Sequence, residues 1–415
     1  TLLASSAASD VYKRQLELQA SRGIGQLINN AFPSLTTFNL IPVPMFLLMG
    51  ELFFYGGLAT RMFGAVEVLM GKVPGRLSYV TVAGGTAFAT LSGSSMGSTA
   101  LLGSLMVPEM SARGYKKHMS IGPILGTGGL AMLIPPSALA VLLGTLAQLD
   151  IGKLLIGGIM PGIILATMYV ALIWFQCRID PEAAPVYDVD LPPFSERLRL
   201  FARDVLPMLA VIIGVIILIM FGIATPSESA AFGCLGILGL CALYRSLNFK
   251  VLVDSVAGAL RVTVMAFLII FGSATFSALL AFSGASAGLL EWAVSFDLSP
   301  LSMLFIMFAI LLVLGMFMDQ LSMMLLTVPI FFPLASQLGF DLIWFGVIVL
   351  LALEISFTTP PFGLLLFVMK GVAPPDTKMT DIYLAGIPFI LCAIAVVILM
   401  VIFPDVALYL PNLVK

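Results

Sequence analysis

Long apolar runs, separated by short polar or proline-containing breaks, dominate the hydropathy pattern of the chain. The runs 154–175, 204–223 and 382–403 each reach the roughly 18 apolar residues that a helix needs to cross a bilayer. The pattern therefore predicts an all-α polytopic membrane protein.

Two breaks in this pattern lie close together in the first half of the chain. The polar run 92–98 separates the apolar arms 77–90 and 100–110, and the break 134–137 interrupts the run 119–146. A broken helix leaves backbone groups unpaired in lipid, so it persists only inside protein or beside a polar cavity. We therefore expect a helical hairpin and a broken helix that contribute to a binding site.

The same arrangement returns in the second half of the chain. Paired breaks of this kind are how many secondary transporters build a site near the bilayer midplane. The duplication therefore predicts a second hairpin and a second broken helix. Matching residues lie 225 positions apart (333 − 108 = 225): Pro108 and Pro333, Gly114 and Gly339, Pro135 and Pro360, and Pro136 and Pro361.

The basic residues predict the orientation of the two hairpins. Arg76, Arg113 and Lys116 flank the first hairpin, and cytoplasmic loops are enriched in such residues. No Lys or Arg occurs between Arg261 and Lys370, a stretch that includes the second hairpin. The second hairpin thus enters from the outer face, as expected for an inverted repeat.

The overall composition supports a membrane protein and excludes several other classes. The chain is 60% apolar and 10% charged, with a mean hydropathy of +1.11 and a net charge of −2, whereas soluble proteins are about 25% charged. The absence of a basic cluster argues against a nucleic-acid partner. The four cysteines lack metal-ligand spacing, so no metal site beyond a coupling ion and no cofactor is expected.

The repeat also predicts how the chain is divided. The helix 230–244 has no counterpart before the first repeat, so we expect a first helix to be missing. The polar start of the chain resembles translated cloning sequence. The predicted segments are a non-native leader (1–14), scaffold helices and an interfacial arm (15–76), the first half of a transport domain (77–147), further scaffold helices and a second arm (148–300), the second half of the transport domain (301–371), and a C-terminal membrane helix (372–415).

The polar run 92–98 carries the first candidate chemistry. Its serine hydroxyls and the backbone carbonyls freed by its glycines suit a hard cation such as Na⁺, and the ends of broken helices add their dipoles. Helix packing is the alternative, because Gly93 and Gly97 also form a G-x-x-x-G spacing. The neighbouring break 134–137 favours the ion site.

An enzymatic interpretation of the same run has little support. The stretch from Gly93 to Gly97 also matches G-x-S-x-G, the turn that presents a nucleophilic serine in some hydrolases. That chemistry needs a nearby histidine, and His118, the single histidine, lies in the basic cytoplasmic loop. A membrane-embedded enzyme is therefore a remote alternative.

The second hairpin carries an ionisable residue at its tip. Asp319 lies 225 positions after Ser94, and an acidic residue at membrane depth suggests a cation ligand or a proton carrier. A helix-capping role facing water is the structural alternative. Thr358 and Thr359 offer hydroxyls just before the second proline pair, and Glu354 lies one turn earlier.

These motifs resemble the large membrane subunit of tripartite ATP-independent periplasmic (TRAP) transporters, and the similarity extends from about residue 40 onward. The residues that carry it are Ser92-Gly93-Ser94, Pro108, Gly114-Tyr115 and Ile134-Pro135-Pro136-Ser137, followed by Asp319, Pro329, Pro333, Gly339, Phe345-Gly346, Thr359-Pro360-Pro361 and Gly363.

The resemblance implies an inverted-repeat elevator fold in the bacterial inner membrane. It further implies Na⁺-driven uptake of a small organic acid, such as a C4-dicarboxylate. A periplasmic solute-binding protein would deliver the solute, and a small four-helix membrane subunit would complete the scaffold in the lipid bilayer.

The resemblance also assigns roles to individual residues. Glu354 departs from the family pattern, which leads us to expect an apolar or amide residue there. One Na⁺ site would comprise Ser92, Gly93, Ser94 and Ser95 with Ile134, Pro135 and Pro136; the other would comprise Gly315 and Asp319 with Thr358, Thr359 and Pro360; and substrate would contact Ser98, Ser137, Glu354 and Gly363.

Two other transport mechanisms remain open on the sequence. A stand-alone ion-coupled carboxylate transporter of related fold would need no binding protein. A passive channel would conduct without a Na⁺ gradient.

Overall fold

The computed structural model describes residues 40–186, 192–282, 288, 291, 295–296 and 298–414, with the side chains of Ser92 and 273–282 excluded. The expected leader 1–14 and most of the second interfacial arm therefore lie outside the described residues.

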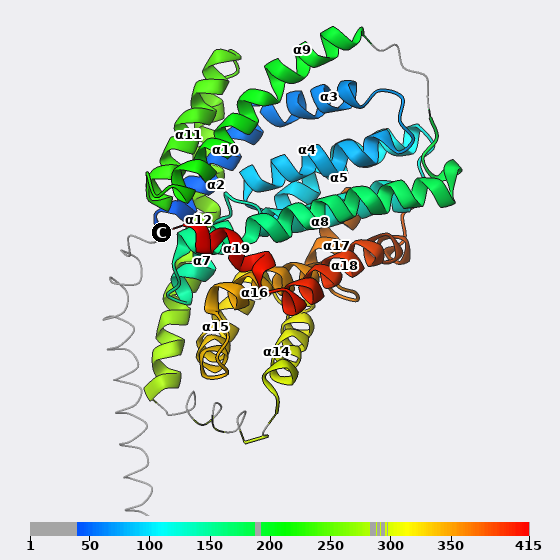
Figure 1. Ribbon diagram of the computed structural model, residues 1–415. Coiled ribbons are helices and arrows are strands. Elements are labelled where there is room, and N and C mark those ends of the chain that lie inside the picture. The colour runs from blue at the N-terminus through cyan, green and yellow to red at the C-terminus, as the bar shows by residue number, and fades with distance from the viewer. Residues whose placement is uncertain are drawn as a thin grey trace, which may run out of the picture.

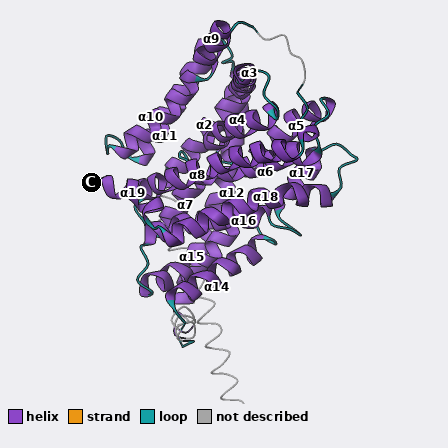
Figure 2. Cartoon of the chain, turned by 45° about the vertical axis from the view of Figure 1, so that its right-hand side comes forward, coloured by secondary structure: helices purple, strands orange, loops and turns teal. Residues whose placement is uncertain are grey.

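Every regular element in the described part of the chain is helical, as Figure 2 shows. Five of these helices are long and apolar enough to cross a membrane, and the number rises to eight if each of three sharply bent helix pairs counts as one span. The prediction of an all-α, multi-pass membrane protein is confirmed.

The first repeat opens with a spanning helix that turns sharply. Helices α2 (Pro42–Tyr55) and α3 (Leu58–Met70) meet at an angle of 65°. Gly57 makes this turn in the left-handed backbone region, with φ of +71°, which costs a glycine little. The apolar helix α2 thus turns into the amphipathic helix α3 within the segment 15–76, which was predicted to hold scaffold helices and an interfacial arm.

The first hairpin and the first broken helix follow directly. Helices α4 (Arg76–Ser92) and α5 (Ser95–Ala112) form the hairpin, and α6 (Lys117–Leu133) and α7 (Ala138–Leu146) form a helix bent by 46° at its break.

The second repeat reproduces these bounds. Its hairpin comprises α14 (Pro300–Gly315) and α15 (Gln320–Gln337), and its broken helix comprises α16 (Leu342–Thr358) and α17 (Leu364–Val372). Adding 225 to the bounds of α5 (95 to 112) and α6 (117 to 133) returns those of α15 (320 to 337) and α16 (342 to 358). The predicted duplication is confirmed at the level of helix bounds.

The remaining helices surround or connect the two repeats. They are α8 (Ile151–Ile179), η2 (Pro181–Ala183), α9 (Phe194–Asp204), α10 (Leu206–Met220), α11 (Pro226–Leu243), α12 (Phe249–Phe282), α18 (Met379–Ile402) and α19 (Asp405–Leu413).

Helix α9 falls largely in the stretch from Arg178 to Arg203, whose basic residues Arg197 and Arg199 predict a cytoplasmic loop between two membrane runs. It is amphipathic and lies beside α3, as Figure 1 shows at the top of the view. Arg61 of α3 reaches Asp204 at the end of α9, with 3.3 Å between Nη1 and Oδ1. The high charge of this segment suggested a loop, but the packing partner on α3 makes it a helix.

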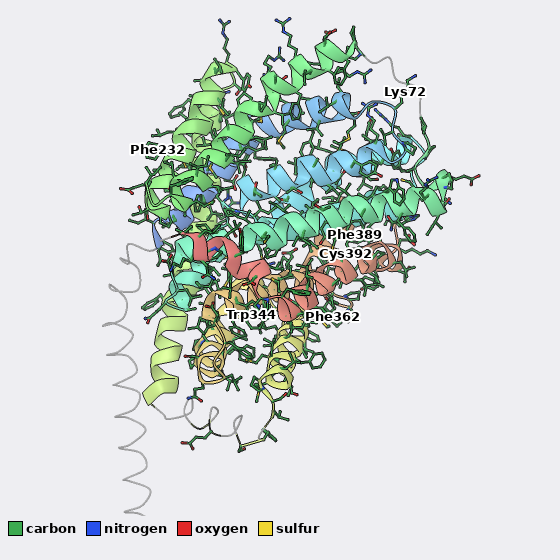
Figure 3. The ribbon with its side chains drawn as sticks, viewed as in Figure 1. Lys72, Phe232, Trp344, Phe362, Phe389 and Cys392 are labelled. Atoms are coloured by element: carbon green, nitrogen blue, oxygen red, sulfur yellow. The ribbon has the colours of Figure 1, made fainter. Side chains whose placement is uncertain are left out.

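Helices α6 and α16 form the centre of the protein. All residues from Met119 to Leu133 and from Trp344 to Thr358 are buried. Glycines in α6 allow this density, since a Cβ atom at Gly122 or Gly126 would lie 2.5 Å from the ring of Phe389. Figure 3 shows that ring on α18.

Candidate functional site

The tip of the first hairpin lies against the first broken helix. Gly93 ends α4 with φ of +58°, and Ser94 begins α5 as its N-cap, where Oγ accepts a hydrogen bond from Gly97 N at 3.1 Å. A Cβ atom added to Gly93 would lie 3.5 Å from Cβ of Ala138. Ser137, next to it, caps α7 by accepting from Ala140 N at 3.3 Å.

The tip of the second hairpin has the same design with a charged cap. Asp319 Oδ1 accepts from the backbone N–H groups of Leu321 and Ser322, each at 3.0 Å, and Oδ2 accepts from Ser322 Oγ at 2.5 Å. Asp319 is therefore a helix cap, as the structural alternative expected.

A single cavity of about 290 Å³ brings the two tips together. Asp319 is the only charged residue in its described lining, and α2, α7, α12 and α16 supply the remaining walls. The lining residues are Val43, Leu47, Gly93, Ser94, Ser95, Met96, Ala138, Leu139, Leu142, Val262, Met265, Ala266, Asp319, Gln320, Leu321 and Phe357.

Glu354 of α16 connects the two tips through buried hydrogen bonds. Its Oε2 atom accepts from Ser95 Oγ at 3.0 Å and from Gln320 Nε2 at 3.1 Å. Ser95 is the first residue of α5 and Gln320 the first of α15. One carboxyl group on the second broken helix therefore contacts both hairpin tips.

The other predicted ion-site residues of the second half surround the break in α16. Thr358 Oγ1 and Thr359 Oγ1 both donate to Ile355 O, at 3.0 and 2.6 Å. Gly315, at the end of α14, packs so tightly that an added Cβ would lie 2.0 Å from Oγ of Ser356. The hairpin arm and the broken helix are thus in direct contact.

The structure places the remaining predicted residues outside the lining of this cavity. Their ion-binding or substrate-binding roles stay predictions, and the side chain of Ser92 lies outside the described part. These residues are Ile134, Pro135, Pro136, Gly315, Thr358, Thr359 and Pro360 among the predicted ion ligands, and Ser98, Ser137, Glu354 and Gly363 among the predicted substrate contacts.

Sequence reasoning missed Gln320 and Gly129. Gln320 lies 225 positions after Ser95 (320 − 95), a polar residue at the repeated position, so the offset could have identified it. Gly129 lies 225 positions before Glu354 (354 − 129), and an added Cβ would lie 2.5 Å from Cγ of Glu354. Gly129 therefore makes the space that the glutamate side chain occupies.

Comparison with known proteins identifies the family. The sequence pattern of the family described as the DctM component of the tripartite ATP-independent periplasmic transporters matches residues 11–406. The chain belongs to this family. As a DctM-family protein it is one component of a three-part transporter in the bacterial inner membrane, and it is a transport protein rather than an enzyme.

Relatives of this DctM-family chain carry several solute names. It is 31% identical over 381 residues to the C4-dicarboxylate TRAP transporter large permease protein of Pseudomonas aeruginosa, covering 90% of this chain and 86% of that one. It is 28% identical over 380 residues to the isethionate TRAP transporter permease protein DctMQ of Oleidesulfovibrio alaskensis, covering 91% of this chain and 59% of that longer one. The sialic acid TRAP transporter permease protein of Haemophilus influenzae is 29% identical over 384 residues, covering 92% of this chain and 61% of that one.

Solved structures share the fold of this DctM-family chain at low sequence identity. The YdaH transporter of Alcanivorax borkumensis matches with a TM-score of 0.65 and 12% identity, over 93% of this chain and 86% of that one. MtrF of Neisseria gonorrhoeae matches with a TM-score of 0.64 and 12% identity, over 90% and 83%. The predicted class of membrane transporter fold is thereby confirmed.

Proposed function

We propose that this protein imports a small organic acid, such as a C4-dicarboxylate, by Na⁺-coupled alternating access. A periplasmic solute-binding protein delivers the solute, and a small four-helix membrane subunit completes the scaffold. The observation that carries this proposal is the shared cavity, where both hairpin tips meet walls from α2 and α12.

The charge balance of the cavity supports a coupling cation. No Lys or Arg lines it in the described part of the chain, whereas Asp319 does. An anionic solute needs a compensating positive charge when it leaves water. Bound Na⁺ would supply that charge, and the N-termini of α5 and α15, which begin at Ser95 and Gln320, would add their helix dipoles.

In this proposal each hairpin tip and its neighbouring broken helix hold one Na⁺ ion. Ions organise the two tips, the solute joins them, and the two hairpins with their broken helices cross the membrane as a unit against α2 and α12. The first Na⁺ site comprises Ser92, Gly93, Ser94, Ser95, Ile134, Pro135 and Pro136, and the second comprises Gly315, Asp319, Thr358, Thr359 and Pro360. The proposed substrate contacts are Ser98, Ser137, Glu354 and Gly363.

The names of the relatives support the idea that the solute is selected by another protein and not by this cavity. They include a dicarboxylate, isethionate and sialic acid, although each match covers about 90% of this chain. The binding protein is therefore the proposed source of selectivity, and a small carboxylate is the class of solute to test first.

Uptake into proteoliposomes tests the proposal. The full-length chain is reconstituted with its membrane partner, and radiolabelled C4-dicarboxylates and related acids are supplied with or without binding protein and an inward Na⁺ gradient. Uptake that requires both supports the proposal. Equal uptake without binding protein would favour the stand-alone carrier, and uptake without any gradient would favour a passive channel.

A further inference from the structure

Helix α9 has one side that packs against the protein and another side that is exposed. Leu200 and Phe201 are half-buried and Asp204 is 5% exposed, so these residues mark the side that faces α3. Asp204 Oδ1 also accepts a hydrogen bond from Nη1 of Arg61 on α3, at 3.3 Å. These contacts fix which residues of α9 point away from the protein.

The exposed side of α9 divides into two strips of different chemistry. Residues four positions apart share one strip of a helix, and a set offset by one position lies about 100° further around the axis. Phe194 and Leu198 are 67% and 51% exposed, and the side chain of Arg203 is 61% exposed. The apolar strip comprises Phe194, Leu198 and Ala202, and the basic strip comprises Ser195, Arg199 and Arg203.

The charges around the basic strip leave a positive excess. Arg61 and Arg203 share one carboxylate, that of Asp204, whose Oδ2 lies 2.9 Å from Nη2 of Arg203. Two guanidinium groups and one carboxylate leave one positive charge at that point. Over α9 together with Arg61 the net charge is +2 (4 − 2), from Arg61, Arg197, Arg199 and Arg203 against Glu196 and Asp204.

The exposed apolar side chains of α9 continue into α10, a helix without any charged residue. The two helices meet at a bend of 43° beside Asp204, and Leu206 and Ile213 of α10 are 49% and 51% exposed. Figures 1 and 2 both place α9 at the upper edge of the molecule, above α10. The chain thus changes from charged to wholly apolar at the bend, as a helix does where it passes from the lipid headgroups into the hydrocarbon.

The charge and the polarity of α9 together fit the surface of an anionic membrane. Water does not stabilise the exposed Phe194 and Leu198, whereas an interfacial helix buries its apolar strip at the boundary of the acyl chains. Arginines beside that strip meet lipid phosphates, which a guanidinium group binds with two parallel hydrogen bonds. The basic residues of this region predict a cytoplasmic position, and the cytoplasmic leaflet carries a negative surface potential that attracts them.

We propose that α9 is a binding surface for anionic phospholipids. The apolar strip inserts at the boundary of the acyl chains, and Arg199 and Arg203 bind the headgroup phosphates. Because Asp204 joins α9 to Arg61, lipid bound at α9 also holds α3 at the membrane surface. This surface shares no residue with the lining of the central cavity, so the inference does not depend on the proposed ion and solute contacts.

Fluorescence quenching in lipid nanodiscs measures which lipid lies beside α9. The full chain carries bimane at Ala202→Cys, with the four native cysteines replaced by alanine, and spin-labelled phosphatidylglycerol or spin-labelled phosphatidylcholine is added at equal fractions. Phosphatidylglycerol should quench more strongly at low salt, and added salt should reduce this excess because it screens exposed charges. Arg199→Gln should lower the excess about fivefold, the change expected when one basic residue is lost at an anionic surface.

Arg178→Gln is the matched control for Arg199→Gln. Arg178 is an exposed basic residue at the end of α8, so its loss removes the same charge but should leave the quenching at α9 unchanged. Equal quenching by the two lipids, or an equal loss in both variants, would overturn the proposal. A label that neither lipid reaches once the small membrane subunit is added would also overturn it, because a protein would then cover α9.

Native mass spectrometry tests the same surface without replacing any cysteine. During removal of lipid by detergent, Arg199→Gln should retain fewer phosphatidylglycerol molecules than the wild-type chain and the same number of phosphatidylcholine molecules. Equal retention of phosphatidylglycerol by the two chains would overturn the proposal even if the labelled chain failed to fold.

Discussion

The two halves of the transport region have the same backbone plan but different charges. Each half has a hairpin whose second helix begins at a capping side chain, Ser94 in one and Asp319 in the other. Each has a central helix of 17 residues that ends before a proline pair. Yet Gly129 in the first half corresponds to Glu354 in the second.

This difference has a physical cause. The caps and breaks repeat because each helix end must satisfy its backbone groups in either half. The carboxyl group cannot repeat, because a side chain at Gly129 would collide with Glu354, with 2.5 Å between the added Cβ and Cγ. Both halves therefore share the same backbone requirements. The carboxyl group of Glu354, in contrast, occurs once and contacts the hairpin tips of both halves.

The largest expected effect is a difference in solute uptake between variants of the two capping residues, Asp319 and Ser94. Asp319→Ala removes the acceptor of two backbone hydrogen bonds and the only charge in the described lining of the central cavity, so solute uptake should fall to background. Ser94→Ala removes one accepted hydrogen bond, which costs about 1 kcal/mol, and should reduce uptake without abolishing it.

Asp319→Asn is the control for this pair. Asparagine also caps helices well, so this variant should keep wild-type thermal stability while losing uptake. Equal uptake in the Ala variants of both caps would contradict the proposed difference between the halves.

The contact at Gly315 should have the next largest effect. Gly315→Ala places a Cβ atom 2.0 Å from Oγ and 2.4 Å from Cβ of Ser356, so overpacking should cost about 1–3 kcal/mol. The corresponding position in the first half is Thr90 (315 − 225), where a side chain already fits. Thermal unfolding in detergent measures the loss.

A second substitution tests the cause of that loss. Ser356→Gly removes the two nearest of the three atoms that the new Cβ meets and leaves Met323 Cε at 3.1 Å, so the double variant should recover part of the lost melting temperature. A double variant no more stable than Gly315→Ala would show that the clash lies elsewhere.

A smaller effect is expected at Gly93, a left-handed residue whose counterpart in the second tip, Met318 (93 + 225), does not have a positive φ. Gly93→Ala should cost about 1 kcal/mol because of its φ of +58°. Gly97→Ala is the matched control, since it lies inside α5 and its added Cβ would be 3.3 Å from Ser94 Oγ. Similar melting temperatures for the two variants would contradict the backbone explanation.

The smallest effect concerns a surface ion pair beyond the first hairpin. Lys116 Nζ donates to Asp180 Oδ2 at 2.5 Å and holds the pKa of Asp180 below its ordinary value. A lowered folded-state pKa stabilises the protein above the unfolded pKa of about 3.9, and this contribution is lost as pH falls through the folded value. Asp180→Asn should therefore melt slightly earlier than wild type at pH 7.

The pH dependence of this difference is the check. The gap between Asp180→Asn and wild type should narrow as pH falls below about 4. A gap that stays constant down to lower pH would show that Asp180 acts through packing rather than charge.

Local patterns in the sequence predicted most of the helical plan. The breaks at 92–98 and 134–137, and their copies 225 positions later, follow from polar and proline residues in apolar runs, and the structure has helix ends at each. Helix α9 was missed because its many charges resemble those of a loop, and only its contact with α3 reveals its place.

The sequence alone determined that the chain crosses the membrane, that it is duplicated, and where its helices break, because each depends on residues close together along the chain. Only the tertiary structure decided that Glu354 meets Ser95, 259 positions earlier, and Gln320 at the same oxygen atom. That contact depends on how α5, α6, α15 and α16 pack, and on the space that Gly129 leaves. Hydrophobic periodicity shows that these helices are buried, but it carries no information about which side chains meet inside.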